Sequence, residues 1–218
     1  MLNRIILFLF CSILFNCCNA QQNNNLEKAS ETLKNSRGQL PTKLTKHFPG
    51  MVISQDYKIS LFTDTSENNV GLVLYNYGLQ KFEFDSILKQ TLNLKCLAKY
   101  NSNDTCLLIV NKNQIDVFEK PEKKVDTNDS IISDDKCDLN KYPIPNFIGN
   151  NLQERVIESS RICKGFEIIV LEARPTQKFK EFPLKKNPTM PEMWSNGYSF
   201  GICYNKESST FIYWSILW

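Results

Sequence analysis

The chain has 218 residues, of which 42% are hydrophobic and 22% are charged, and this is the composition of an ordinary globular protein. Its formal net charge of +3 falls to +2 when Arg4 leaves with an N-terminal leader, and such a balance gives no electrostatic argument for binding nucleic acid. The length suits one domain with a single hydrophobic core. The eight glycines form neither a phosphate-binding loop nor a dinucleotide fingerprint, so no cofactor is expected.

The first twenty residues have the layout of an export signal. A short cationic start, Met1–Arg4, precedes the apolar run Ile5–Phe15. This run is shorter than the segment of about 20 residues that a membrane-spanning helix needs. The sequence therefore predicts a signal peptide over residues 1–20, which is removed on export.

The residues at the end of the leader predict how the mature protein is attached to a membrane. The stretch Leu14–Cys17 resembles the lipobox of bacterial lipoproteins, in which the cysteine becomes the lipidated first residue of the mature chain. The resemblance implies lipidation of Cys17, with Cys18 as the alternative, and hence attachment to a membrane. Cleavage after Ala20 would instead give a secreted protein, and a leader that is retained as an anchor is the third alternative. The polar tract Gln21–Asn25 has the composition of a flexible tether.

The composition and the two chain ends also resemble those of a group of bacterial proteins. The hydrophobic leader, the many Asn, Lys and Ile residues and the closing segment Tyr213–Trp218 are similar to small uncharacterised envelope lipoproteins of the Bacteroidetes. This resemblance implies no activity. Surface-exported lipoproteins of that group often carry acidic residues just after the cysteine, whereas the first acidic residue here is Glu27. The resemblance therefore implies an outer-membrane lipoprotein that faces the periplasm.

The first half of the mature chain is expected to be rich in strands. Residues 21–50 combine the tether with a short helix at Leu26–Asn35, and residues 51–218 form one globular domain. Because short turns separate the strands, an antiparallel meander is expected. Runs of β-branched and aromatic residues predict the strands at Val52–Thr63, Val70–Tyr77, Leu79–Ile87, Leu92–Tyr100, Thr105–Lys112 and Gln114–Glu119.

The second half begins after a long acidic segment. Residues 120–138 hold several aspartates and little to bury, which predicts an exposed loop, and their spacing does not match a calcium-binding EF-hand loop. Beyond it, the pattern predicts a helix at Leu152–Ile162, a strand at Gly165–Ala173, a helical turn at Met190–Ser195 and a hairpin over residues 196–218.

The last hairpin strand, Thr210–Trp218, is apolar on both sides, which is typical of a strand in a sheet that is covered on both faces. The predicted fold class is therefore α+β and mostly β, with an antiparallel sheet built from a meander and a C-terminal hairpin and with one or two short helices.

Five cysteines follow the leader, and an oxidising compartment permits disulfides between them. The odd number leaves at least one free thiol, for which the buried side of the hairpin suggests Cys203. Cys137 and Cys163 flank the start of the second half, and a disulfide between them would staple the acidic loop. Trp194 is expected to be half exposed, either as plain packing or as an anchor for a protein partner.

Catalytic motifs are scarce. The single histidine, His47, is expected at the surface of a Lys-rich loop, and one histidine excludes a His-based metal cluster. The string Gly197–Gly201 reads G-x-S-x-G, but a nucleophile elbow needs a following helix and a later histidine, so we interpret the match as chance.

These observations favour a non-catalytic binding protein of the bacterial envelope with a protein partner, for example an immunity or inhibitor-type protein. The alternative is a small periplasmic hydrolase that uses paired carboxylates. Its candidate acids are Glu154, Glu158, Glu167 and Glu172.

Overall fold

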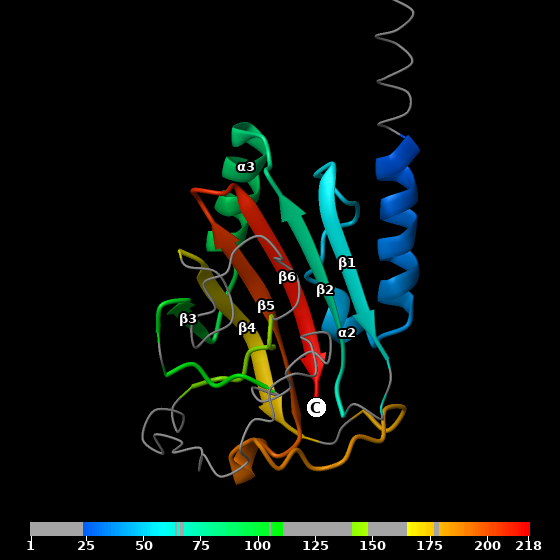
Figure 1. Cartoon of the computed structure of the whole chain (residues 1–218), viewed down its shortest axis with the longest axis vertical. Coiled ribbons are helices and arrows are strands. Elements are labelled where there is room, and N and C mark those ends of the chain that lie inside the picture. Colours follow the sequence, from blue (N-terminus) through cyan, green and yellow to red (C-terminus); the bar gives the residue numbers. More distant parts are fainter. Residues whose placement is uncertain are drawn as a thin grey trace, which may run out of the picture.

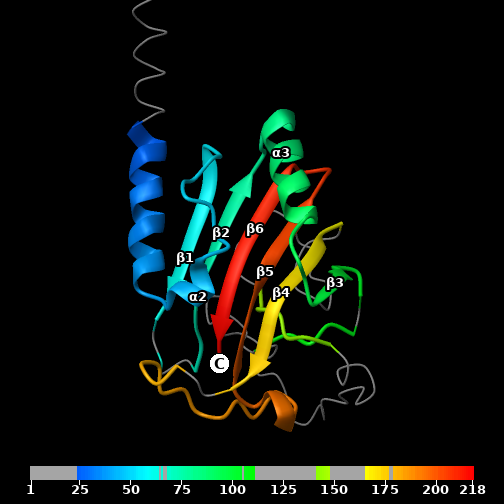
Figure 2. The ribbon, with the colours of Figure 1, turned by 180° about the vertical axis from the view of Figure 1, so that it is seen from behind.

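The computed structural model describes residues 24–63, 65, 68–104, 106–110, 141–147, 165–176 and 179–218. Within these ranges, six strands form one antiparallel sheet in the order β1-β2-β6-β5-β4-β3 (Figures 1 and 2). This architecture confirms the predicted α+β, mostly β class. The strands are β1 (Asp56–Phe62), β2 (Val70–Tyr77), β3 (Ala98–Asn101), β4 (Glu167–Pro175), β5 (Gly197–Asn205) and β6 (Thr210–Leu217).

The C-terminal strand joins the two parts of the sheet. Strands β3 to β6 lie side by side in chain order, and β1 and β2 pair with each other. Strand β6 pairs with β5 on one side and with β2 on the other, so the last strand of the chain lies near the middle of the sheet. Trp218 continues this pairing, because it exchanges two backbone hydrogen bonds of 3.0 and 3.1 Å with Gly197.

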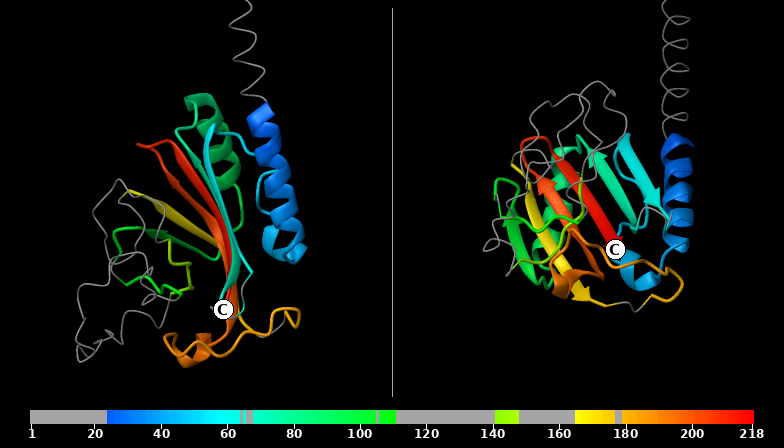
Figure 3. Two further views of the ribbon diagram at one scale, coloured as in Figure 1. Left: turned by 45° about the vertical axis from the view of Figure 1, so that its right-hand side comes forward. Right: turned by 60° about the horizontal axis from the view of Figure 1, so that its bottom comes forward.

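Both faces of the sheet are covered, as the apolar last strand predicts. Every residue of β5 and β6 is buried. One face, here called the helical face, packs against a helix over residues 24–38, against α2 (Thr42–Thr45) and against α3 (Lys81–Leu92). The opposite face, here called the loop face, packs against residues 107–110 and 144–147. Figure 3 shows the 24–38 helix and the 107–110 segment on opposite sides of the sheet.

Several predicted elements are confirmed. Strand β2 has the predicted bounds, β4 falls on the predicted strand at 165–173, and the hairpin of β5 and β6 falls on residues 196–218. The helical turn near Trp194 is the 3-10 helix η3 (Glu192–Trp194). The predicted helix at 26–35 is present and longer, because it covers residues 24–38.

The strand predicted at Leu79–Ile87 is wrong, because this segment begins helix α3. Alternating phenylalanines suggest a strand, but Phe82 is 74% exposed whereas Phe84 is 5% exposed. The buried and half-buried side chains follow helical spacing instead. The helix starts with a capping box, in which Gln80 and Glu83 bond each other's backbone N–H.

The strand predicted at Thr105–Lys112 is also wrong over its described residues. Residues 107–110 are all buried, but the only ladder contact that they make with other described residues is an isolated parallel bridge between Ile109 and Ile144. This segment is hydrophobic because it covers the loop face, and it is not a strand of the sheet. The predicted strand at 114–119, the acidic loop at 120–138 and the helix at 152–162 lie outside the described residues.

Gly201 lies at the tightest point of the sheet and gives a first prediction. A Cβ atom there would lie 2.1 Å from the Ile169 carbonyl oxygen and 2.7 Å from the Trp214 ring. Since the Ile169 carbonyl belongs to the neighbouring strand, it cannot retreat without opening the sheet. We expect Gly201→Ala to lower the free energy of unfolding by about 2–3 kcal/mol, as measured by urea denaturation.

The matched control is Gly38→Ala, because no atom lies within 4 Å of a Cβ at that position. We expect this control to leave the urea midpoint unchanged or slightly higher. If Gly201→Ala unfolded at the same urea concentration as the wild type, the close approach described here would be disproved.

Candidate functional site

Three polar side chains from distant parts of the chain meet above one end of the helical face. Lys43 comes from α2, Glu172 from β4 and Tyr198 from β5. The Lys43 Nζ donates to Glu172 Oε1 at 2.6 Å and to the Tyr198 hydroxyl at 2.7 Å. The Tyr198 hydroxyl donates to the same Glu172 oxygen at 2.5 Å, and Arg174 Nε lies 3.3 Å from it. We call these four residues the Lys43 cluster.

The contacts within the Lys43 cluster fix its protonation states. The hydrogen bond to Glu172 raises the pKa of Lys43 above its ordinary value. Burial raises the pKa of Glu172, but the hydrogen bonds from Lys43 and Tyr198 outweigh burial and hold that pKa below its ordinary value. Burial, followed by the bond to Glu172, raises the pKa of Tyr198. At neutral pH the cluster therefore holds a charged lysine, a carboxylate and a neutral phenol.

These protonation states suit an ion-paired clip better than a catalyst. A nucleophilic lysine needs a lowered pKa, and a carboxyl group that acts as a general acid needs a raised one. Both shifts run in the opposite direction here. What the Lys43 cluster does physically is to hold α2 against the ends of β4 and β5.

The clip gives a second prediction. We expect Glu172→Gln to lower the free energy of unfolding by about 1–2 kcal/mol, because Lys43 and Tyr198 lose a charged acceptor while the partly exposed site limits the loss. Since the pKa of Glu172 is lowered by folding, its contribution is present above the ordinary pKa and disappears as pH falls through the folded pKa. Urea denaturation at pH 7 and at acid pH would measure both effects.

Glu207→Gln is the control for this prediction, because Glu207 is exposed in the turn between β5 and β6. It removes the same charge without touching the clip. Equal losses of stability in the two variants would show that net charge, and not the Lys43 cluster, causes the effect.

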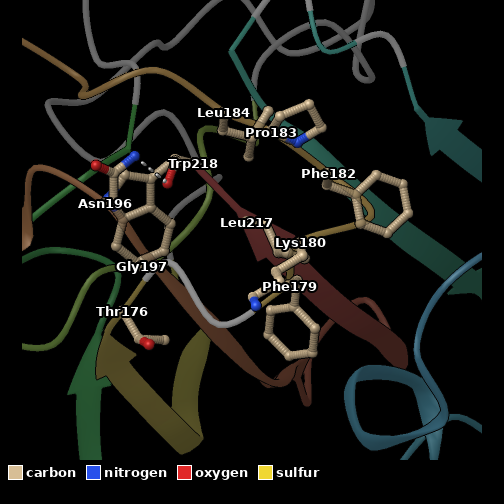
Figure 4. Close-up of a pocket in the computed structure, with 10 residues that line it drawn as sticks. All are labelled: Thr176, Phe179, Lys180, Phe182, Pro183, Leu184, Asn196, Gly197, Leu217 and Trp218. Carbon is tan, nitrogen blue, oxygen red and sulfur yellow. Dashed lines mark hydrogen bonds between the residues drawn. The ribbon is translucent and has the colours of Figure 1, made fainter.

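A pocket of about 330 Å³ opens next to the Lys43 cluster, at the end of the sheet where β5 starts and β6 ends (Figure 4). The two sites touch, because the Phe179 ring meets the Tyr198 ring edge-on at 5.4 Å between centroids. The pocket is lined by Thr176, Phe179, Lys180, Phe182, Pro183, Leu184, Asn196, Gly197, Leu217 and Trp218.

Most of the predicted site residues lie outside the described part of the chain. These are the lipidation candidates Cys17 and Cys18 and the proposed disulfide partners Cys137 and Cys163. Among the cysteines that are described, Cys203 is free and buried, as expected, and Cys96 is also free. The remaining one, Cys106, is disulfide-bonded.

Trp194 is not half exposed as the sequence suggested, and its contacts are those of plain packing, the first of the two alternatives. It is 4% exposed, and its ring lies 6.1 Å from the ring of Trp218 and 6.3 Å from that of Tyr142. Its backbone carbonyl accepts a 2.6 Å hydrogen bond from the Trp218 indole N–H. The side chain is therefore part of the core, and the exposed hydrophobic residue of this turn is Met193, at 57%.

His47 is not a surface residue either. It follows α2, and its ring stacks on Phe200 with 4.8 Å between centroids and 19° between planes. Its Nε2 atom lies 3.0 Å from the Trp214 carbonyl oxygen. In the sequence, the lysines around His47 suggest an exposed loop. The nearby Leu44 and Phe48 pack in the core of the helical face, and they bring this segment onto the sheet.

The interpretation of the G-x-S-x-G string as chance is confirmed. Ser199 lies inside the continuous strand β5 and is fully buried, whereas a nucleophile elbow needs a sharp turn and a helix after the serine. In the described part of the chain, no three His, Cys, Asp or Glu side chains are grouped to hold a metal ion. None of the helices found there has the length and apolar character that crossing a membrane requires.

The Lys43 cluster was not predictable as a unit, because its members lie as far as 155 residues apart in the chain. The pocket has a weak sequence signal, which is the mixture of aromatic, proline and lysine residues over 179–186.

No family model matches this sequence, and no curated protein or solved structure matches it.

Proposed function

We propose that this protein is an exported, lipid-anchored binding protein of the bacterial envelope, which is held by a lipid on Cys17, faces the periplasm and has no catalytic activity. The leader and the polar tether support the location. The observation that carries the binding role is at the end of the sheet, where a pocket lined by both apolar and polar residues adjoins the Lys43 cluster, whose charged groups are paired with one another. Such a pocket offers a ligand contact area and positive charge.

The alternative is a hydrolase with paired carboxylates. One of its candidate pairs, Glu167 and Glu172, does not have the spacing that such a reaction needs. Glu167 and Glu172 lie on either side of a register shift in β4 and face positions four residues apart on β5, so at a rise of about 3.3 Å per residue they are separated by roughly 13 Å. Paired carboxylates of glycoside hydrolases lie about 5–9.5 Å apart. Glu172 is moreover held ionised by Lys43, which favours binding as the function of this end of the sheet. The acids Glu154 and Glu158 lie outside the described residues.

Mass spectrometry of the mature N-terminus, prepared from membrane fractions, tests the location. We expect an acylated Cys17 as the first residue, and we expect Cys17→Ala to release the protein from the membrane fraction. An unmodified N-terminus at Gln21, or a full-length chain that retains its leader, would contradict the anchoring.

Photocrosslinking in intact cells tests the binding role. A photoreactive residue at position 182, in the pocket, is compared with one at position 206, in the exposed turn at the other end of β5. We expect a discrete adduct from position 182 only. The absence of any adduct beyond that of the position 206 control would count against a binding site at this end of the sheet.

A further inference from the structure

The pocket at the end of the sheet has one rigid wall. Trp218 is 1% exposed and is fixed through its indole N–H to the Trp194 carbonyl and through its backbone to Gly197. Asn196 donates from Nδ2 to the carbonyls of Lys185, at 2.9 Å, and Trp218, at 3.4 Å, so it ties the loop to this wall. A ligand would therefore meet a surface that is largely formed in advance, which lowers the entropic cost of binding.

The other walls combine apolar side chains with positive charge. Phe179, Phe182 and Leu184 are half-buried, and they face the pocket together with Pro183 (Figure 4). The exposed Lys180 belongs to the lining.

The segment 179–186 holds three lysines, Lys180, Lys185 and Lys186, against one acid, Glu181, so it carries a net charge of +2. The nearby Glu172 does not offset this charge, because Lys43 and Arg174 already neutralise it. The ligand chemistry that complements such walls is an apolar body with an anionic head.

The size of the pocket restricts the ligand further. Its volume of about 330 Å³ lies at the lower end of the range of about 300–1,000 Å³ for small-molecule sites. This leaves room for one short acyl chain and not for a two-chain lipid. We propose that the pocket binds a single-chain carboxylate amphiphile of medium length, with its tail against Phe182 and Leu184 and its carboxylate beside Lys180. This assignment rests on the binding function proposed above and names the ligand class of that site.

Decanoate is the probe for this assignment. The protein without residues 1–20 keeps every element that the structure describes, and decanoate is titrated into it by isothermal calorimetry and by tryptophan fluorescence, since Trp218 lines the pocket. We expect one site with a dissociation constant of about 10–100 µM. Hexanoate should bind at least about tenfold more weakly because it buries less apolar surface. Decyltrimethylammonium, with the opposite charge, should also bind more weakly than decanoate.

Two variants and one control separate charge from apolar contact. Lys180→Glu should weaken decanoate binding about fivefold through the reversed charge, and Phe182→Ala should weaken it about tenfold by removing part of the wall. Lys206→Glu, the same charge change in the exposed turn at the far end of β5, should bind like the wild type. Lys180 is exposed, so its variant remains informative even if Phe182→Ala fails to fold.

Three results would overturn the assignment: no saturable decanoate binding, equal affinity for the cationic amphiphile, or equal weakening by Lys180→Glu and Lys206→Glu. These results are distinct from failure of the proposed function. A protein that is acylated on Cys17 and crosslinks at position 182, but does not bind decanoate, would refute only the ligand class. A protein that binds decanoate but lacks the anchor would refute only the location.

Discussion

Trp218→Ala should lower the free energy of unfolding by about 3–5 kcal/mol, the range for removing a fully buried tryptophan. The side chain is 1% exposed and belongs to the core of the loop face. Its removal would leave a cavity against Trp194 and would also leave the Trp194 carbonyl without the 2.6 Å hydrogen bond from the indole. Urea denaturation followed by circular dichroism would measure the loss.

Two companion variants identify the cause of this loss. Trp218→Phe keeps an aromatic ring but lacks the indole N–H, so it should fall between the wild type and the alanine variant. Met193→Ala, on the exposed side of the same turn, should change stability by less than about 0.5 kcal/mol. A Trp218→Ala protein within about 1 kcal/mol of the wild type would mean that the last residue does not close the core.

His47 should make the protein sensitive to mild acid, with a loss of about 3 kcal/mol between pH 7 and pH 4. Burial lowers the pKa of His47 to about 3. The backbone groups of Trp214 and Gly201 offset this shift in part, and the charges of Arg37 and Lys46 add to it.

The sign of the effect follows from the two pKa values. In the unfolded chain, the pKa of a histidine is about 6.5, so the unfolded state binds the proton first as the pH falls. The stabilisation that neutral His47 provides is therefore complete above about pH 6.5 and is lost progressively down to about pH 3.

The measurement is the free energy of unfolding of the wild type and of His47→Gln across this pH range. The glutamine variant also loses the stacking on Phe200, so it should be less stable at pH 7. The difference between the two proteins should shrink as the pH falls, because carboxylates titrate alike in both. A difference that stayed constant from pH 7 to pH 4 would show that His47 titrates normally in the folded protein.

The local sequence pattern was sufficient to predict the bounds of strands whose two faces carry the same kind of side chain. Strands β2 and β6 are mostly apolar or aromatic on both faces and end at clear turns, so their bounds follow from the sequence. The free and buried state of Cys203 follows from its place on the hairpin. The sequence of helix α3 predicts a strand instead, because two phenylalanines two residues apart fit a strand, although one of them points into solvent.

The fold class, the central strands, the burial of the aromatic end and the prediction of an exported protein follow from the amino-acid sequence, because they depend on periodicity and composition over short windows. Which distant segments contact one another is visible only in the folded protein. The tertiary structure set β6 between β2 and β5, turned His47 and Trp194 inward and brought Lys43, Glu172 and Tyr198 together. The physical reason is that a contact between distant segments depends on the whole packed core, and no local pattern of side chains encodes it.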